Sequence, residues 1–322
     1  MSKPSILLTR PWPEKAQAYL EARYAVTLRD GTTLSKADLM EAMRTYDALC
    51  PTLTDRLDAE VLGTPEARVK MIANFGAGFE HIDLEAAKAA GISVSNTPGA
   101  LTEATAEIAL LLMLMTSRRA SEAERGVRSG RWDGWKPTQF LGQSLKGKTL
   151  GLVGFGRIAQ STAQKARAAL GVEIAYYSRR QAAAETEAEL GARYVPSLQQ
   201  LAAEADVLSL HTPGGPDTRH LVDAALLKKM KPDAIVINTA RGSVINEADL
   251  AAALKDGIIG AAGLDVYEQE PKIHPDLMAL DNAVLLPHLG SATIETRTDM
   301  GLRAAYNLDR FFAGEDLLDR IA

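Results

Sequence analysis

The sequence predicts an α/β protein with two doubly wound parallel-sheet domains, and three observations support this class. Apolar, strand-like runs alternate with helix-like segments through the first hundred positions, as in successive βαβ units. The same alternation returns between residues 150 and 286. A chain of 322 residues is also long enough to form two domains, each with its own hydrophobic core.

In the first half, short apolar runs predict strands at residues 6–8, 24–28, 48–49, 69–72 and 92–94. The segments between them predict helices at 13–23, 36–44, 55–62 and 83–90. The distinctive loop of this half, Asn74-Phe-Gly-Ala-Gly78, follows a strand and precedes Asp83, a candidate helix cap. Its glycines fit either an anion-binding nest of N–H groups or an ordinary turn, and the residues alone leave both open.

A linker at 96–100 leads into a helix over 101–117 that is apolar on nearly all sides. Such a helix is expected to be buried, and one candidate partner is another subunit. After an aromatic, basic loop at 130–137, the second domain has predicted strands at 150–153, 172–177, 207–210, 234–237, 260–264 and 283–286. A helix is predicted at 158–170 and a last one at 295–312, so the second domain is expected to cover 99–291.

The segment LGLVGFGRIAQ at 150–160 gives the clearest functional signal. Gly154 permits a tight turn after a buried strand, Gly156 lets the backbone approach a pyrophosphate, and the following helix presents unpaired N–H groups. Ala159 stands where a third glycine is usual and is small enough to pack the helix on the strand. In this context the motif predicts a Rossmann dinucleotide site. The turn residues expected to contact the cofactor are Gly154, Phe155, Gly156, Arg157 and Ile158.

The end of the next strand refines the choice of cofactor. An NAD site would place Asp or Glu there, whereas this chain has Ser178, Arg179 and Arg180. A hydroxyl and a guanidinium can hydrogen-bond a 2′-phosphate, which a carboxylate would repel. We therefore expect NADP(H) to be preferred, with NAD(H) as a usable second cofactor. The alternative is that the two arginines are only a solvated turn.

Composition limits the remaining classes. A net charge of −5 and no Lys/Arg-rich run argue against nucleic-acid binding, and no apolar run is long enough to span a bilayer. The single cysteine, Cys50, fits a reducing compartment, and the N-terminus continues directly into a strand pattern instead of a signal peptide. We expect a cytoplasmic protein without membrane contact. No cluster has metal-ligand spacing, so no catalytic metal is expected.

Three polar segments follow strands of the second domain, where the ligands of such folds bind. They are Asn238-Thr-Ala-Arg-Gly242, DVYEQEP at 265–271 and PHLGS at 287–291. Each alone is unremarkable, because a lone arginine, acidic run or histidine is usually structural or solvated. Together they supply a cation for a carboxylate, an acid and an imidazole, which suits hydride transfer to a carbonyl beside a nicotinamide.

With these motifs, the chain resembles the D-isomer-specific 2-hydroxyacid dehydrogenase family over essentially its whole length. The motifs are GFGRIAQ, HTP at 211–213, NTARG, GAAGLDVYEQEP and LLPHLGSAT. Within the family it is most similar to glyoxylate/hydroxypyruvate reductases, through ANFGAGFEHID, FLG at 140–142 and YYSRR. The resemblance implies a Rossmann nucleotide-binding domain (99–291) inserted in a flavodoxin-like substrate-binding domain (1–98 and 292–322). It also implies a homodimer formed through the nucleotide domains.

The resemblance assigns catalytic roles to three residues. His288 would protonate the carbonyl oxygen, and Glu270 would bind its other ring nitrogen and stabilise the imidazolium. Arg241 would hold the substrate carboxylate with a fork that Lys lacks. The substrate is expected to contact Arg241, His288 and, in the other domain, Leu53, Phe75, Ala77 and Gly78.

Further cofactor contacts are implied in the same way. Asp265 resembles the residue that fixes the nicotinamide carboxamide, and Thr105 resembles one that reaches the cofactor from the interdomain helix. The other expected cofactor contacts are His211, Thr212, Pro213, Thr218, Thr239, Ala240, His288 and Gly290. Of the remaining histidines, His81 is expected either to line the turn of the first half or, as the favoured alternative, to lie at the polar surface. His220 and His274 are expected in surface or structural roles.

The function expected is NADPH-preferring reduction of small 2-oxo acids, foremost glyoxylate and hydroxypyruvate, to D-2-hydroxy acids. A bulkier 2-oxo acid is one alternative, because Gln139 stands where relatives commonly have an aromatic residue. A less favoured alternative is a non-catalytic NAD(P)-sensing protein, since the same fold serves in transcriptional corepressors. A formate dehydrogenase is not expected, because such an enzyme would be expected to carry Gln in place of Glu270.

Overall fold

The computed structural model describes residues 3–322 and divides into two compact units. The terminal unit comprises the residues up to Leu101 together with Ser291–Ala322, and the central unit is Thr102–Gly290. Both units are built on wholly parallel sheets, so the predicted fold class is confirmed. No helix in residues 3–322 has the length and hydropathy needed to cross a bilayer.

The terminal unit contains a five-stranded sheet with the order β2-β1-β3-β4-β5. Its strands are β1 (Ser5–Leu8), β2 (Ala25–Leu28), β3 (Ala48–Cys50), β4 (Met71–Ala73) and β5 (Ser93–Ser95). Its helices are α1 (Glu14–Arg23), α2 (Lys36–Thr45), α3 (Ala59–Leu62), α4 (Leu84–Ala89) and α13 (Ile294–Ala313). Two apolar clusters form its core. Asp83 caps α4 by accepting the N–H of Ala86, as the sequence predicts.

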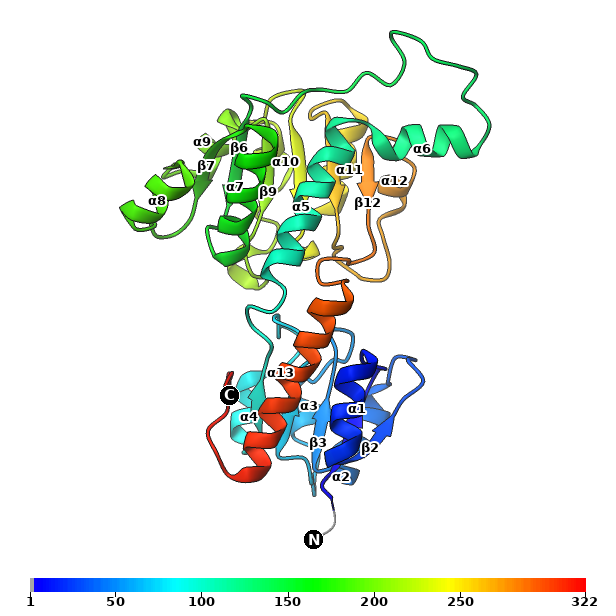
Figure 1. The fold of residues 1–322 in the computed structure, drawn as a ribbon, viewed down its shortest axis with the longest axis vertical. Helices are drawn as coiled ribbons and strands as arrows, with labels where there is room; N and C mark the ends of the chain where they lie inside the picture. Colours follow the sequence, from blue (N-terminus) through cyan, green and yellow to red (C-terminus); the bar gives the residue numbers. More distant parts are fainter. Residues whose placement is uncertain (1–2) are drawn as a thin grey trace. The chain divides into compact units, whose positions relative to one another are not determined.

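The C-terminal helix belongs to this unit because polar groups attach it to the N-terminal segment. The hydroxyls of Tyr19 and Tyr24 both donate to Asp309 of α13, each at 2.6 Å. The tail after α13 is held by Asp319, which accepts from Arg303 at 2.6 and 2.8 Å, and it ends beside β5. A segment from the end of the chain therefore completes the layer over the first strands (Figure 1).

The central unit contains a seven-stranded sheet with the order β12-β11-β10-β9-β6-β7-β8. Its strands are β6 (Thr149–Val153), β7 (Glu173–Tyr177), β8 (Ala192–Tyr194), β9 (Val207–Leu210), β10 (Ile235–Asn238), β11 (Ala261–Leu264) and β12 (Ala283–Leu285). Strand β6 lies between β7 and β9, so the order of connection reverses there. Such a switch point opens a crevice at the carboxyl ends of the strands, where ligands bind.

Helices cover both faces of this sheet. They are α5 (Thr102–Ser117), α6 (Ala120–Arg128), α7 (Arg157–Leu170), α8 (Ala184–Leu190), α9 (Leu198–Glu204), α10 (Ala224–Leu227), α11 (Glu247–Lys255) and α12 (Pro275–Met278), with short 3₁₀ turns η1 (Pro216–Thr218) and η2 (Gly242–Val244). Helices α5 and α7 pack side by side on one face, and α9, α10 and α11 pack on the other (Figure 1).

Helix α5 differs in part from the expectation of burial on nearly all sides. Leu112 and Met113 are fully buried against the sheet, but Leu111 and Leu114 are 41% and 40% exposed. Beyond α6, residues 129–142 form an extended segment without helix or strand, on which Trp135 is 83% exposed (Figure 1). Helix α5 and the segment after α6 therefore carry large apolar side chains in contact with solvent.

Candidate active site

The glycine turn after β6 has the backbone geometry that the motif requires. Gly154 has a φ of +91°, and a Cβ there would lie 2.6 Å from the carbonyl oxygen of His211, so only glycine fits. Gly156 caps α7, and a Cβ added to it would meet nothing within 4 Å. Ala159 is fully buried behind the turn. The first turn of α7 has no acidic residue and no side-chain cap, so its N–H groups can serve an anion.

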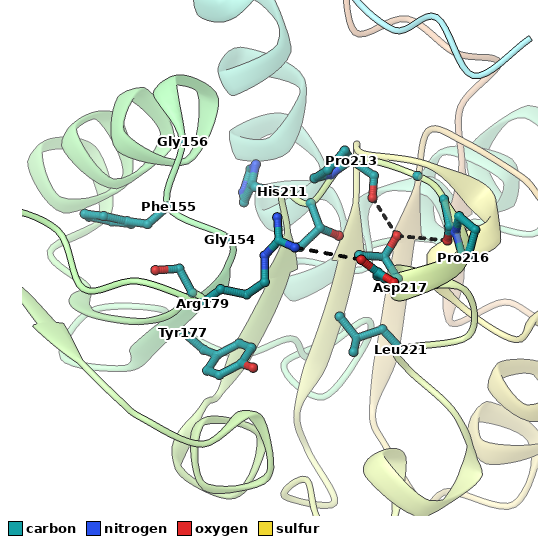
Figure 2. A pocket seen from close by; sticks show the side chains of 15 residues that line it. Gly154, Phe155, Gly156, Tyr177, Arg179, His211, Pro213, Pro216, Asp217 and Leu221 are labelled. Carbon is teal, nitrogen blue, oxygen red and sulfur yellow. Dashed lines mark hydrogen bonds and ion pairs between the residues drawn. The ribbon is translucent and has the colours of Figure 1, made fainter. Parts of the chain in front are cut away.

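A cavity of about 640 Å³ opens in front of this turn (Figure 2). Nine of the residues expected at the cofactor line it: Gly154, Phe155, Gly156, Ser178, Arg179, His211, Thr212, Pro213 and Thr218. Six further lining residues have no counterpart in the sequence prediction: Tyr177, Gly214, Gly215, Pro216, Asp217 and Leu221. The expected residues outside this lining are Thr105, Arg157, Ile158, Arg180, Thr239, Ala240, Asp265, His288 and Gly290.

Two polar side chains of the cavity, His211 and Thr212, differ in how they are hydrogen-bonded. Burial lowers the pKa of His211 to about 4, so this imidazole is neutral at physiological pH, and it hydrogen-bonds the hydroxyl of Ser209 at 2.9 Å. The buried hydroxyl oxygen of Thr212 has no hydrogen-bond partner within residues 3–322. A neutral imidazole suits a packing role, and an unpartnered hydroxyl fits a site that receives a polar ligand.

A second group lies further along the same sheet edge, after β10, β11 and β12. The Nδ1 of His288 and the Oε2 of Glu270 are 2.8 Å apart, and the two side chains are about one-third exposed. The N–H of Tyr267 donates to the other oxygen of Glu270 at 3.0 Å. Burial would raise the pKa of Glu270, but the hydrogen bond and charge of His288, that N–H group and the charge of Arg241 together lower it. Glu270 is therefore an anion that both His288 and Arg241 stabilise.

Asp265 determines the position of His288. Its carbonyl accepts the N–H of His288, and its carboxylate accepts the N–H groups of Leu289 and Gly290 at 2.6 and 2.8 Å. His288 has a φ of +55°, a conformation that needs such support. Burial raises the pKa of Asp265, and the hydroxyl of Thr105 donates to the carbonyl of Gly290. Asp265, Thr105 and Gly290 thus meet in one cluster that holds the backbone around His288.

Arg241 is presented by a loop that the side chain of Asn238 shapes. The Asn238 amide donates to the carbonyl of Arg241 at 2.9 Å and accepts from the N–H of Ala240 at 3.0 Å. A Cβ at Gly242 would lie 1.8 Å from the backbone of Tyr267, so this loop and the segment before Glu270 pack in direct contact. Asn238 and Gly242 are site-building residues that the sequence prediction missed, although both belong to the NTARG motif.

The terminal unit presents the loop after β4. The Asn74 amide donates to the carbonyls of Gly76 and Gly78, and the Asn96 amide donates to that of Ala77 at 2.7 Å. With these carbonyls held, the N–H groups of Ala77 and Gly78 donate to no acceptor in the described part of the chain. This arrangement favours the anion nest over the ordinary turn.

Three other residues of this unit are placed as follows. His81 is not simply a surface residue, because its Nε2 lies 3.0 Å from the Oδ1 of Asn74. Leu53 is 38% exposed next to the loop, whereas the ring of Phe75 packs on Trp12 with centroids 4.9 Å apart. Within residues 3–322, no cluster of three or more His, Cys, Asp or Glu side chains could hold a metal ion.

A doubly wound sheet with a glycine turn, a cavity at its switch point and an acid-backed histidine on the same edge defines the class of nicotinamide-dependent dehydrogenases. The comparisons with known proteins agree. The family described as "D-isomer specific 2-hydroxyacid dehydrogenase, NAD binding domain" matches residues 110–290. The chain belongs to the D-isomer-specific 2-hydroxyacid dehydrogenase family.

Individual relatives cover nearly the whole chain. A glyoxylate reductase of Thermococcus litoralis is 45% identical over 318 residues, which are 97% of this chain and 95% of the relative. A glycerate dehydrogenase of Hyphomicrobium methylovorum is 39% identical over 318 residues, 98% of each chain. The solved NADPH-dependent glyoxylate/hydroxypyruvate reductase of Sinorhizobium meliloti, in complex with NADP and malonate, is 34% identical with a TM-score of 0.87, covering 100% of this chain and 97% of that one.

Proposed function

We propose that the protein reduces small 2-oxo acids to D-2-hydroxy acids, with glyoxylate and hydroxypyruvate as its main substrates and NADPH as its preferred cofactor. The main observation behind this proposal is the contact between Glu270 and His288, together with the charge of Arg241, which helps to lower the pKa of Glu270. The names of the relatives, glyoxylate reductase and glycerate dehydrogenase, support the substrate class. The central unit would bind the dinucleotide and the terminal unit would contribute to substrate binding.

The cofactor site fits a dinucleotide. The open space at Gly156, the uncapped N-terminus of α7 and the unpartnered hydroxyl of Thr212 are groups that would receive a pyrophosphate. Ser178, Arg179 and Arg180 follow β7 and would bind a 2′-phosphate. When bound, the nicotinamide supplies the hydride.

The protein's own residues manage the charge and the proton. Glu270 accepts the Nδ1–H of His288, which fixes the ring and leaves the proton on Nε2 for the substrate carbonyl oxygen. Arg241 binds the substrate carboxylate with two parallel hydrogen bonds. The N–H groups of Ala77 and Gly78 offer a second carboxylate-binding nest. In the oxidation direction His288 takes the proton back.

We further propose a cytoplasmic homodimer. Large apolar side chains are exposed on α5, α6 and the extended segment after them: Leu111, Leu114, Val127, Trp132, Trp135 and Leu141. A surface of this kind on a soluble protein is typical of a subunit interface. Analytical ultracentrifugation of the wild type and of Trp135→Ser would test the dimer, and a monomeric wild type would refute it.

A panel of initial rates tests the activity. Glyoxylate, hydroxypyruvate, pyruvate and phenylpyruvate would each be assayed with NADPH and with NADH. We expect the first two acids to give the highest kcat/KM, with a preference for NADPH that falls when Arg179 or Arg180 is replaced by Gln. Faster turnover of phenylpyruvate would instead identify an enzyme for bulkier acids. Cofactor binding without turnover of any acid would identify a sensor.

A further inference from the structure

Two opposite charges face each other across the cofactor cavity. Arg179 follows β7 on one side of the switch point, and Asp217 lies in η1 on the other side. The guanidinium Nη1 and the carboxylate Oδ2 are 3.8 Å apart, and Figure 2 shows both side chains pointing toward each other. Within the described residues this is the only ion pair that either side chain makes. The arginine expected to bind a 2′-phosphate therefore already has an anionic neighbour.

The backbone that carries Asp217 is held in place. The hydroxyl of Thr218 donates to the carbonyls of Pro213 and Gly215 at 2.7 and 3.3 Å, which closes the loop before η1. Pro216 fixes the backbone directly before Asp217. The carboxylate is 87% exposed, so it is hydrated, but its Cα position in the cavity wall is set by the fold. A cofactor entering the cavity must accommodate this charge.

Asp217 also supplies what the end of β7 lacks. Sites that bind a ribose with a free 2′-hydroxyl usually have an acidic residue directly after this strand, where the present chain has Ser178. From the opposite wall, Asp217 offers a carboxylate that can accept a hydrogen bond from a 2′-hydroxyl. The same carboxylate repels a 2′-phosphate and competes with it for Arg179.

We propose that Asp217 helps to determine whether the protein binds NADPH or NADH. Arg179 and Arg180 favour NADPH, and the charge of Asp217 reduces this preference. This inference rests on the proposed function, since it concerns the cofactor of that reaction. With NADH, the Arg179–Asp217 pair stays intact. With NADPH, Arg179 must turn from Asp217 to the phosphate, and the two anions remain close. The protein therefore uses both cofactors, and Asp217 is the residue that keeps NADH competitive.

The expected effect is modest because both side chains are hydrated. Exposed ion pairs contribute up to about 1 kcal/mol, and a ten-fold change in affinity corresponds to about 1.4 kcal/mol. Replacing Asp217 by Asn should therefore tighten NADPH binding by about five-fold and leave NADH binding within about two-fold or slightly weaker. The gain should shrink at high salt, because exposed charges are screened.

Calorimetric titration of the full-length protein with NADPH and NADH, without substrate, tests this directly. The variants are Asp217→Asn and, as a matched control, Glu204→Gln, which removes the charge of an exposed pair with Arg193 outside the cavity. The proposal predicts a changed NADPH-to-NADH affinity ratio in the first variant only. An unchanged ratio in Asp217→Asn, or the same change in both variants, would overturn it. If wild type bound neither dinucleotide, the proposed function itself would fail.

Discussion

Replacing Glu270 by Gln removes one charge and nearly preserves the shape of the side chain. In the wild type, Oε2 of Glu270 and Nδ1 of His288 are 2.8 Å apart, which is hydrogen-bond distance. Hydrogen bonds to charged groups contribute about 1.5–3 kcal/mol. The side chains are 33% and 31% exposed, so we take the lower end, about 1.5 kcal/mol. Because 1.36 kcal/mol corresponds to a ten-fold change in rate, losing this interaction in the transition state should lower kcat/KM about ten-fold.

The assay is kcat/KM for glyoxylate reduction at a fixed pH. Glu270→Gln should lower kcat/KM about ten-fold, because the neutral amide no longer stabilises the ring of His288 as it passes its proton to the carbonyl oxygen. Glu268→Gln is the matched control, because Glu268 lies on the same segment and pairs with the Nε2 of His220 at 2.6 Å. An unchanged kcat/KM in Glu270→Gln, or an equal loss in the control, would refute the assigned role of Glu270.

Three further outcomes are expected. Arg241→Lys should lower kcat/KM for glyoxylate about ten- to hundred-fold, because Lys lacks the planar fork that binds a carboxylate. Cofactor affinity, measured by calorimetry, should not change. A parallel loss of cofactor binding would argue against a role of Arg241 in binding the substrate. Gly154→Ala should lower the free energy of unfolding by more than about 2 kcal/mol in chemical denaturation, because Gly154 has a positive φ and a Cβ there would lie 2.6 Å from a backbone oxygen. Gly156→Ala should lower it by about 1 kcal/mol at most and should weaken cofactor binding. Equal losses of stability in the two variants would contradict the turn geometry. Burial would raise the pKa of Asp319, but its hydrogen bonds to Arg303 and Asn307 and the charge of Arg303 lower it. The carboxylate therefore stabilises the fold fully above about pH 4, and this contribution falls as the pH drops through the lowered pKa. Asp319→Asn should cost about 2 kcal/mol at pH 7 and progressively less below pH 4, as measured by urea unfolding; a cost that does not change with pH would argue against this role.

Much of the fold could be predicted because its strands are short apolar runs between helix signals. The strand expected at 150–153 is Thr149–Val153, and the one expected at 172–177 is Glu173–Tyr177. The sequence analysis missed strand β8 because this strand has three residues, lies at the sheet edge and has only one buried side chain. The sequence of helix α5 is apolar on nearly all sides, yet the sheet covers only one of them. The sequence could not predict this, because the spacing of apolar residues does not show which side of a helix has a packing partner.

Looking for polar segments at strand ends led the sequence analysis to Arg241, Glu270 and His288, and in the structure Glu270 lies 2.8 Å from His288 and is influenced by the charge of Arg241; their catalytic roles stay a prediction. The site could not be predicted where a residue acts through the backbone of another. Asn74 and Asn96 shape the loop at Ala77 by donating to its carbonyls, and an asparagine in a loop has no distinctive spacing. The sequence also suggested Asp265 as a cofactor contact but gave no indication that it holds the turn of His288, because that requires knowing which N–H groups point at its carboxylate.

In the proposed reaction, His288 donates a proton to the substrate and is not required to hold the cofactor. The most direct measurement compares His288→Ala with wild type in two assays of the same preparation, NADPH oxidation with glyoxylate and calorimetric binding of NADPH. We expect a loss of turnover of at least about 10²-fold, with cofactor affinity within a few-fold of wild type. Turnover close to that of wild type in His288→Ala would show that the proton comes from another group.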